Sequence, residues 1–295
     1  MSESIVALDW GTSSLRGALL AADGRVLEER FFAQGILTVD KGGFEAVFEK
    51  CFGDWMQPNT LCLIAGMAGS QQGWMDAPYC PCPAGFADIA ARLAWVEAGC
   101  IAIVPGLSIN KKGVPDVMRG EETQVFGALQ LLGLKDARLV LPGTHSKWVT
   151  VASDRITDFS TWMTGEFYAL LSQHSILART MPAIDAPHDD AAFDEGVAYA
   201  LRGQSLLHSA FSARTLSLFK RMATNALPSY LSGLVIGEEL KHQQLVPGDS
   251  VVLVGSDRLS KKYAQALQQL GVSTCSVGNQ ATWHGLRSIA NQLIC

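Results

Sequence analysis

Short apolar strands alternate with polar turns in the first part of the chain, whereas helical spacing dominates the last part. Residues 4–20 predict an apolar strand, a tight turn containing Gly11, and a second apolar strand. The dipeptide Asp23-Gly24 is a strong turn signal that leads into a third expected strand at residues 26–30. Three antiparallel strands are therefore expected to open the protein.

The next hundred residues predict a mixture of helices and strands. Large apolar residues recur at helical spacing from Phe44 to Trp55, and Pro58 is expected to end that helix. Further along we expect strands at 61–65 and 101–104, a helix near 86–98, a loop at 108–115 and a helix from about Gly120.

The second half repeats the opening plan before it becomes mostly helical. Expected strands at 138–141 and 147–151 flank a second Gly and hydroxyl turn, and a third strand follows at 155–159. The remaining pattern predicts helices at 165–174, 193–202, 206–219, 229–240, from 259 and at 282–293, and strands at 251–254 and 272–276. The repeat is one of structure, because no sequence period of a solenoid is present.

Composition narrows the class of protein. Of 295 residues, 48% are hydrophobic and 17% charged, so the chain can bury a core and is not disordered. A net charge of −5 argues against binding nucleic acid, which favours a basic surface. No leader or apolar run long enough for a bilayer is expected, which argues against a membrane protein. The seven cysteines are scattered along the chain, which favours reduced thiols in the cytoplasm. Cys80 and Cys82 are closely spaced, but a zinc site is not expected because no second Cys or His pair accompanies them.

The two polar turns carry the candidate chemistry. Gly11 has no Cβ, and Thr12 and Ser13 offer hydroxyls and backbone N–H groups, which together suit a phosphate. Asp9, at the mouth of this turn, is a candidate to hold hydrated Mg²⁺ beside a phosphate. The alternative is an ordinary hairpin with polar turn residues, because short motifs of this kind also occur by chance.

Both turns resemble the phosphate motifs of the sugar kinase–actin superfamily. Asp9-Trp10-Gly11-Thr12-Ser13 resembles the first motif, Leu141 to Trp148 the second, and Val254 to Leu259 stands where the adenosine motif belongs. The resemblance implies an α/β fold of two ribonuclease-H-like (actin-like ATPase) domains with a central cleft. The expected domains are residues 1–133 and 134–295, and the last helix returns to the first domain in some relatives.

Several blocks narrow the resemblance to one family, the 2-dehydro-3-deoxygalactonokinases. The most specific blocks are Met118-Arg119-Gly120-Glu121-Glu122-Thr123-Gln124 and Pro142-Gly143-Thr144-His145-Ser146-Lys147-Trp148. Blocks at residues 66–70, 163–166 and 231–237 also match, in order. The family implies ATP-dependent phosphorylation of the 6-hydroxyl of 2-dehydro-3-deoxy-D-galactonate in galactonate breakdown, with ATP and Mg²⁺ as cofactors. The alternatives are another sugar or sugar-acid kinase of the same fold, or an actin-like ATPase that phosphorylates no sugar.

The resemblance also implies roles for residues at the two turns. The phosphates of ATP are expected to bind between two sets of residues, Gly11, Thr12 and Ser13 on one side and Gly143, Thr144, His145, Ser146 and Lys147 on the other. Gly255 and Ser256 are expected beside the adenosine. For His145 and Lys147, simple packing or a surface cation is an equal alternative, and Gly255 could be a turn glycine.

An acceptor hydroxyl needs a base within hydrogen-bond reach. In related sugar kinases this carboxylate lies at the start of the helix before the second phosphate turn, where Glu121 is the first candidate and Glu122 and Asp116 are rivals. The alternative is that acidic residues favour a helix N-terminus through the helix dipole. Arg119 is a candidate to contact the substrate or the transferred phosphate, or to form a plain ion pair with Glu122.

A sugar acid needs hydroxyl and amide partners as well as a partner for its carboxylate. The first candidates follow the strand at 61–65 and are Ser70, Gln71, Gln72 and Trp74; an ordinary polar loop is the alternative. Thr164 and Glu166 match a family block, but they could also cap the following helix. The sequence does not fix the oligomeric state, and a homodimer stays among the expectations.

Overall fold

In this computed structural model, residues 4–183 and 186–293 are described, and they form two compact units. Unit 1 comprises residues 4–139, 149–160 and 277–293, and unit 2 comprises the described residues of 140–148 and 161–276. The chain thus contributes to each unit from more than one segment.

The largest sheet has six strands in the order β3-β2-β1-β4-β7-β6. β1 pairs antiparallel with β2 and parallel with β4, which places Asp9 opposite Arg16 on one side and Ala65 on the other. The strands are β1 (Ser4–Trp10), β2 (Leu15–Ala21), β3 (Val26–Phe32), β4 (Leu61–Gly66), β6 (Ala94–Glu97) and β7 (Ile101–Ile103). β1, the central strand of the two that flank the first turn, is a nearly continuous run of buried residues, whereas β2 mixes buried with half-buried residues.

A second sheet has five strands in the order β12-β11-β10-β13-β14. They are β10 (Ala137–Leu141), β11 (Ser146–Ala152), β12 (Arg155–Trp162), β13 (Ser250–Val254) and β14 (Ser273–Val277). Counted along the chain within the sheet, this order is third, second, first, fourth and fifth, and the larger sheet has the same order over its third, second, first and fourth strands. The prediction that the second half repeats the opening plan is confirmed.

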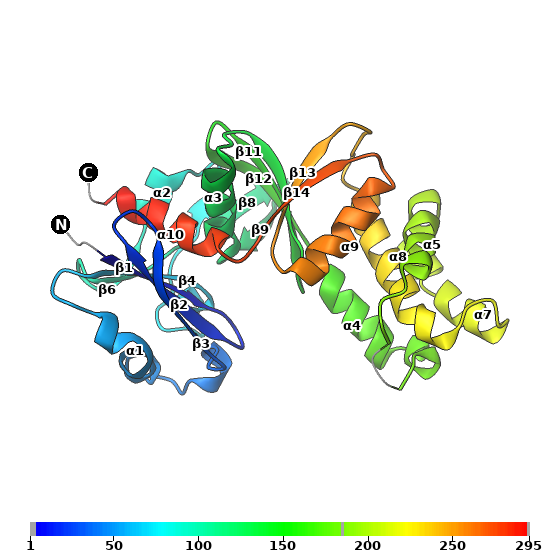
Figure 1. Ribbon diagram of the computed structural model, residues 1–295, viewed down its shortest axis with the longest axis horizontal. Coiled ribbons are helices and arrows are strands. Elements are labelled where there is room, and N and C mark those ends of the chain that lie inside the picture. Colours follow the sequence, from blue (N-terminus) through cyan, green and yellow to red (C-terminus); the bar gives the residue numbers. More distant parts are fainter. Residues whose placement is uncertain (1–3, 184–185, 294–295) are drawn as a thin grey trace. The chain divides into compact units, whose positions relative to one another are not determined.

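Helices cover both faces of the large sheet in unit 1 (Figure 1). α1 (Phe44–Phe52) packs Phe48 and Phe52 against the strand residues Leu8 and Trp10 on one face. α3 (Glu121–Leu132) and α10 (Ala281–Asn291) lie together on the other. The remaining short segments of this unit are α2 (Phe86–Ala90) and the 3₁₀ helices Ile36–Thr38, Gly53–Trp55 and Met67–Gly69.

Glycines bring α3 and α10 into direct backbone contact. A Cβ at Gly127 would overlap the carbonyl of Ala281, and one at Gly285 would overlap the carbonyl of Thr123. Because a side chain at either position would push the helices apart, α3 depends on a partner from the far end of the sequence.

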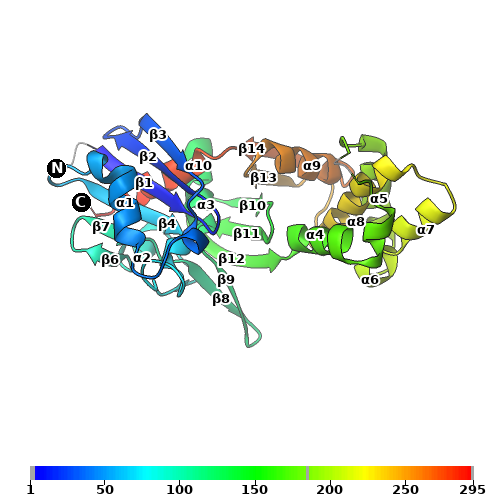
Figure 2. The ribbon, with the colours of Figure 1, turned by 90° about the horizontal axis from the view of Figure 1, so that it is seen from below.

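Unit 2 is mostly helical, and two of its helices cross at glycines. α5 (Asp190–Arg202) and α8 (Leu227–Lys241) run side by side (Figures 1 and 2), and Gly196 and Gly233 leave no room for a Cβ there. The other helices are α4 (Thr164–His174), α6 (Leu206–Ser209), α7 (Ser212–Leu218), α9 (Asp257–Gln268) and the 3₁₀ helices Ile176–Thr180 and Thr224–Ala226. No helix of the described chain combines the length and the apolar character needed to cross a bilayer.

The helix expected at residues 86–98 is wrong in its second half. α2 ends at Ala90, and Ala94–Glu97 instead form β6, which pairs antiparallel with β7. Alternating exposure of Trp95 and Val96 suits a sheet edge with one face covered. The first half of this segment therefore has the spacing of a helix, whereas the second half has the two-residue alternation of a strand.

The loop expected at residues 108–115 is also wrong, because the segment is a β-hairpin. β8 (Leu107–Lys111) pairs with β9 (Val114–Met118), and β5 (Cys80–Pro81) adds a third strand to this small sheet. Lys112 and Gly113 form the turn at positive φ, and Gly113 N donates to Asn110 Oδ1 at 2.8 Å. The polar tip that suggested a loop is a two-residue hairpin turn.

The single helix expected at residues 206–219 is divided into α6 and α7. The Ser212 hydroxyl donates to the Ser209 carbonyl at 2.6 Å. Such local side-chain bonds compete with the helical ladder, and the interruption falls between these serines.

Candidate active site

Backbone hydrogen bonds and a close backbone contact fix the conformation of the first polar turn. Gly11 N donates to Ser14 O at 2.9 Å, and Ile36 N donates to Gly11 O at 3.0 Å. A Cβ at Gly35 would overlap the carbonyl of Thr12, so this close contact requires glycine. Thr12 and Ser13 are exposed at the tip, and their hydroxyls are accessible to a ligand.

Asp9 lies at the end of β1 and forms an ion pair with Arg16. Arg16 Nη2 and Nε donate to Asp9 Oδ2 at 2.7 and 2.9 Å. Both bonds use one oxygen, and Oδ1 lies near Gly66. A single carboxylate oxygen suits Mg²⁺ that keeps several waters, because this ion binds through one or two carboxylates and substrate phosphates. Across residues 4–183 and 186–293, no group of three or more His, Cys, Asp or Glu side chains could hold a metal ion.

The segment after β4 lines a cavity of about 360 Å³ in unit 1, here called the unit 1 cavity. The structure brings four predicted residues to it, Ser70, Gln71, Gln72 and Arg119, together with Met67, Asp76 and Tyr79. Trp74 instead lines a neighbouring cavity and packs its ring against Trp10 and Phe48, with centroid distances of 6.0 and 5.6 Å.

Arg119 is a half-buried cation with unused donors. Its guanidinium lies over the Tyr79 ring at 4.4 Å from the centroid, and Nη2 donates to Ala77 O at 2.7 Å. Nε and Nη1 are buried and have no hydrogen-bond partner among the described residues. Buried donors of this kind are costly unless a partner satisfies them, and a bound anion would do so.

The three candidate bases lie in different surroundings. Glu121 Oε2 accepts a hydrogen bond from Arg119 N at 3.0 Å, and the residue is half-buried at the first turn of α3. Glu122 is fully buried and accepts from Gly120 N at 2.7 Å. Burial raises the pKa of Glu122 to about 8, and the charge of Glu121 adds to this rise. Asp116 lies on β9, the strand that precedes α3.

The second polar turn contacts the N-terminus of α4 within unit 2. A Cβ at Gly165 would lie within 2.8 Å of Thr144 Cα, and Glu166 N donates to Thr144 O at 3.0 Å. His145 Nε2 and Glu166 Oε2 are 2.6 Å apart. Thr164 and Glu166, expected at the substrate, therefore pack beside the residues expected at the phosphates.

Two residues of the second turn point inward. Ser146 is fully buried, and its hydroxyl is 2.8 Å from the Tyr263 hydroxyl. Lys147 is also buried, and its ammonium donates to Thr161 Oγ1 at 2.9 Å. These side chains stabilise the base of the turn, which leaves Gly143, Thr144 and His145 as its accessible residues.

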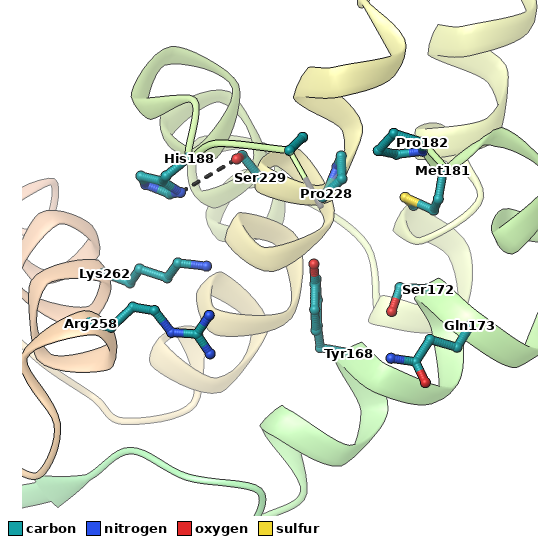
Figure 3. Close-up of a pocket in the computed structure, with 11 residues that line it drawn as sticks. Tyr168, Ser172, Gln173, Met181, Pro182, His188, Pro228, Ser229, Arg258 and Lys262 are labelled. Carbon is teal, nitrogen blue, oxygen red and sulfur yellow. Dashed lines mark hydrogen bonds between the residues drawn. The ribbon is translucent and has the colours of Figure 1, made fainter. Parts of the chain in front are cut away.

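A cavity of about 270 Å³ begins at Gly143 and Thr144 and lies wholly in unit 2; we call it the nucleotide cavity because the sequence predicts ATP at this turn. Val235, Ile236 and Leu259 give it an apolar wall, and Tyr168, Ser232, Arg258 and Lys262 contribute polar groups. Figure 3 shows Tyr168, Arg258 and Lys262, which also line a neighbouring cavity of unit 2. Gly255 adopts φ +147°, and its added Cβ would lie 3.8 Å from Pro142 O. The expected adenosine motif thus lies beside the expected phosphate turn.

Sequence reasoning missed Glu239, which lies under the second turn. Its carboxylate accepts from Trp148 Nε1 at 2.6 Å, from Tyr263 OH at 2.7 Å and from the Thr164 hydroxyl. Burial raises the pKa of Glu239, and the hydrogen bonds from Thr164, Tyr263 and Trp148 oppose this rise. The available signal was the pair Glu238-Glu239, which directly follows the apolar stretch of α8.

Comparison with known proteins identifies the family. The model of the 2-keto-3-deoxy-galactonokinase family matches residues 9–289. The chain belongs to the 2-keto-3-deoxy-galactonokinase family. The resemblance inferred from the sequence blocks is thus confirmed.

Individual relatives of this kinase family match over nearly their whole length. The chain is 38% identical to DgoK1 of Rhizobium meliloti (strain 1021), named a probable 2-dehydro-3-deoxygalactonokinase, with 97% of this chain and 96% of the relative covered. It is 35% identical to the 2-dehydro-3-deoxygalactonokinase of Escherichia coli (strain K12), with 99% of both covered. A crystal structure from Sinorhizobium meliloti matches with a TM-score of 0.90, 36% identity and 99% coverage of each chain.

More distant solved structures share the fold of this chain, among them the activator of 2-hydroxyisocaproyl-CoA dehydratase from Clostridium difficile and component A of the (R)-2-hydroxyglutaryl-CoA dehydratase of Acidaminococcus fermentans. These two match at 12% identity with TM-scores of 0.52 and 0.54, a likeness that concerns the fold alone. Together with the repeated strand order, they confirm the predicted α/β fold of two actin-like domains.

Proposed function

We propose that this chain transfers the γ-phosphoryl group of ATP to the 6-hydroxyl of 2-dehydro-3-deoxy-D-galactonate, giving the 6-phosphate and ADP in galactonate breakdown. Membership of the 2-keto-3-deoxy-galactonokinase family over residues 9–289 carries the proposal. Relatives with the corresponding name match at 35% and 38% identity over nearly the full length. The proposed location is the cytoplasm, which suits an ATP-dependent enzyme with free cysteines.

The nucleotide cavity is proposed to bind ATP. Its apolar wall suits the base and ribose, and the Gly143-Thr144 end suits the phosphates. Thr12 and Ser13 contribute exposed hydroxyls at the other turn. Mg²⁺, when bound through Asp9 and water, would offset charge on the β- and γ-phosphates.

The unit 1 cavity is proposed to bind the sugar acid. Ser70, Gln71 and Gln72 offer hydroxyl and amide groups that suit the sugar hydroxyls. The positive charge of Arg119 suits the carboxylate, because the described residues leave two of its nitrogens without an acceptor.

Glu121 is proposed to accept the proton of the 6-hydroxyl. It is more accessible than Glu122, and it lies at the first turn of α3, directly after Arg119 and Gly120. The hydroxyl oxygen would form a bond to the γ-phosphorus as the bond to the β–γ bridging oxygen breaks, and ADP would leave. Glu122 and Asp116 remain the alternative bases.

A coupled assay of ADP release tests the function. We expect turnover that requires ATP, Mg²⁺ and 2-dehydro-3-deoxygalactonate together. Turnover with an aldohexose but not with this acid would contradict the proposed substrate. ATP hydrolysis that no acceptor stimulates would contradict the assignment as a sugar-acid kinase.

Arg119→Lys tests the proposed carboxylate contact. The variant keeps the charge but loses the planar guanidinium. KM for the sugar acid should therefore rise at least tenfold, which is the order of magnitude for losing one charge-assisted hydrogen bond, while KM for ATP stays unchanged. Arg92→Lys, at an exposed position of the same unit, is the matched control. Equal KM values for the sugar acid in the two variants would exclude the contact.

A further inference from the structure

The ion pair at the end of β1 uses only one carboxylate oxygen. Arg16 Nη2 and Nε both donate to Oδ2 of Asp9, at 2.7 and 2.9 Å, so Oδ1 takes part in neither bond. An arginine that faces a carboxylate frequently forms two parallel bonds instead, one to each oxygen. That arrangement would cover Oδ1, the oxygen that the ion pair leaves for Mg²⁺. The contacts that hold Arg16 on Oδ2 therefore bear on the proposed metal site.

Two residues of α10 contact the guanidinium. Arg16 Nη2 also donates to Thr282 Oγ1 at 3.3 Å, and Arg16 Cζ lies 5.5 Å from the centroid of the Trp283 ring. A cation within about 6 Å of an aromatic face is attracted to it. Thr282 is fully buried and Trp283 nearly so, whereas the side chains of Arg16 and Asp9 are 22% and 19% exposed. The ion pair is thus accessible to a ligand, while the residues that hold it are not.

The first turn of α10 is itself fixed from two sides. The helix packs against β1 and β2 (Figure 1). The Ala281 carbonyl lies where a Cβ at Gly127 of α3 would stand, and Trp283 Nε1 donates to Glu29 of β3. Because α3 and β3 both hold this turn, Thr282 and Trp283 can fix the orientation of a neighbouring side chain. All of these residues belong to unit 1.

We propose that Thr282 and Trp283 are positioning residues for the Mg²⁺ site. They keep the guanidinium of Arg16 on Oδ2 of Asp9, which leaves Oδ1 available to the ion. Without them, Arg16 binds both oxygens and competes with Mg²⁺. This positioning role rests on the proposed function, and it involves a segment 266 residues beyond Arg16 in the sequence.

Calorimetric titration of the full chain with ADP, with and without Mg²⁺, tests this role without an activity assay. Mg²⁺ should tighten the binding of ADP to the wild type, because the ion would bind both Asp9 and the phosphates. Thr282→Val keeps the shape of the side chain and removes the hydroxyl. It should weaken the binding of Mg·ADP about fivefold, the scale of one lost hydrogen bond, and leave the Kd for ADP without Mg²⁺ within about twofold.

Thr60→Val is the matched control. Thr60 is also buried in unit 1, and its hydroxyl also accepts one hydrogen bond, from Gln57 N at 3.1 Å. It precedes β4 at the end of the strand opposite to Ala65, the partner of Asp9. This variant should bind ADP as the wild type does, both with and without Mg²⁺.

Two substitutions of Trp283 separate the aromatic contact from the general packing of α10. Trp283→Phe retains an aromatic face for the cation and should bind Mg·ADP within about twofold of the wild type. Trp283→Leu loses that face and should weaken the binding of Mg·ADP about as much as Thr282→Val does. Equal losses with and without Mg²⁺ in Thr282→Val and Trp283→Leu would assign these residues to packing alone and overturn the positioning role.

Arg16→Lys tests the competition for Oδ1. Lysine has no planar fork and cannot cover both oxygens, so adding Thr282→Val to Arg16→Lys should not weaken the binding of Mg·ADP further. An equal loss from Thr282→Val in both backgrounds would overturn the positioning role. Wild-type protein that binds ADP equally with and without Mg²⁺ would overturn it as well, whereas the proposed function fails only if the coupled assay shows no turnover of the sugar acid.

Discussion

Glu121 and Glu122 are neighbours in sequence but differ in their access to solvent. Glu122 is fully buried and closes the turn before α3 through its bond with Gly120 N. Glu121 remains half-exposed and accepts from Arg119 N. A carboxylate that exchanges protons with a bound hydroxyl must be accessible to it, as Glu121 is, whereas the full burial of Glu122 suits a structural role.

Glu121→Gln should remove the base and leave binding intact. We expect kcat to fall at least 100-fold, since a positioned base contributes about 10² to 10⁴ in rate. The Kd for ATP should stay within twofold, measured by calorimetry. A kcat within threefold of the wild type would transfer the role to Glu122 or Asp116.

Glu122→Gln should alter the pH dependence of stability. The folded protein retains this proton up to a pKa of about 8, whereas the unfolded chain releases it near 4.5, so stability should fall as pH rises across that window. One such proton corresponds to about 1.4 kcal/mol per pH unit. Urea unfolding between pH 5 and 8 should give a shallower slope for the variant than for the wild type.

The control for this titration is Glu45→Gln, at an exposed position of α1. It should keep the slope of the wild type. An unchanged slope in Glu122→Gln would show that this carboxylate is already ionised in the folded protein.

At the scale of elements, Glu239 joins four segments of unit 2. It stands on α8 and binds Trp148 of β11, Thr164 at the start of α4 and Tyr263 of α9. The second turn and the α4 terminus therefore share one buried acceptor. Removing it would leave buried donors unsatisfied close to the nucleotide cavity.

Glu239→Ala should lower the free energy of unfolding by about 3 kcal/mol, the scale for breaking a buried charged network. Glu239→Gln should recover more than half of this loss, because its carbonyl accepts from Trp148 while the hydroxyls of Thr164 and Tyr263 accept from its amide. We also expect KM for ATP to rise in Glu239→Ala and to return toward the wild type in Glu239→Gln. Equal stability and equal KM in both variants would contradict this positioning role.

The sequence predicts well those elements in which the apolar residues keep one spacing, helical or alternating, from end to end. The strands around both turns and helices such as α5 and α8 have this property, and all were expected within a few residues. The segment 86–98 contains two periods, and the hairpin at 107–118 has a polar tip, so local patterning failed for both. β6 pairs with β7, which follows it directly, and β8 pairs with β5, which lies much earlier in the chain; the spacing of apolar residues reveals neither pairing.

The candidate site shows the same limit. Motif spacing found Arg119, Gly143 and Thr144, which line cavities in the structure. It could not tell that Ser146 and Lys147 point inward, because alternation along β11 is hidden where both of its faces are buried. Their roles at the phosphates, like that of His145, stay predictions, as does the role of Trp74 at the sugar acid.

At the scale of the whole molecule, the two proposed substrates have separate cavities in separate units. The unit 1 cavity lies after β4, and the nucleotide cavity lies between α4, α8 and α9 of unit 2. Each unit is itself assembled from segments that are not contiguous in sequence. The linear division at residues 133 and 134 stays a prediction.

Hydrogen exchange should therefore distinguish the two ligands. ADP should slow exchange mainly in α4, α8 and α9, and the sugar acid mainly in residues 67–79 and the start of α3, because each cavity is lined by those segments. Protection of residues 67–79 by ADP alone would contradict this division. Arg119→Lys should weaken only the protection by the sugar acid.

The glycine contact between α3 and α10 has a consequence for the order in which the protein is made. On the ribosome, α3 emerges long before the helix whose backbone it touches at Gly127 and Gly285. Residues 161–276, by contrast, are synthesised without interruption, and their helices have one another as partners as they appear. While residues 161–276 are being made, α3 therefore has no helix to contact at Gly127. It reaches its final packing only after α10 has been synthesised.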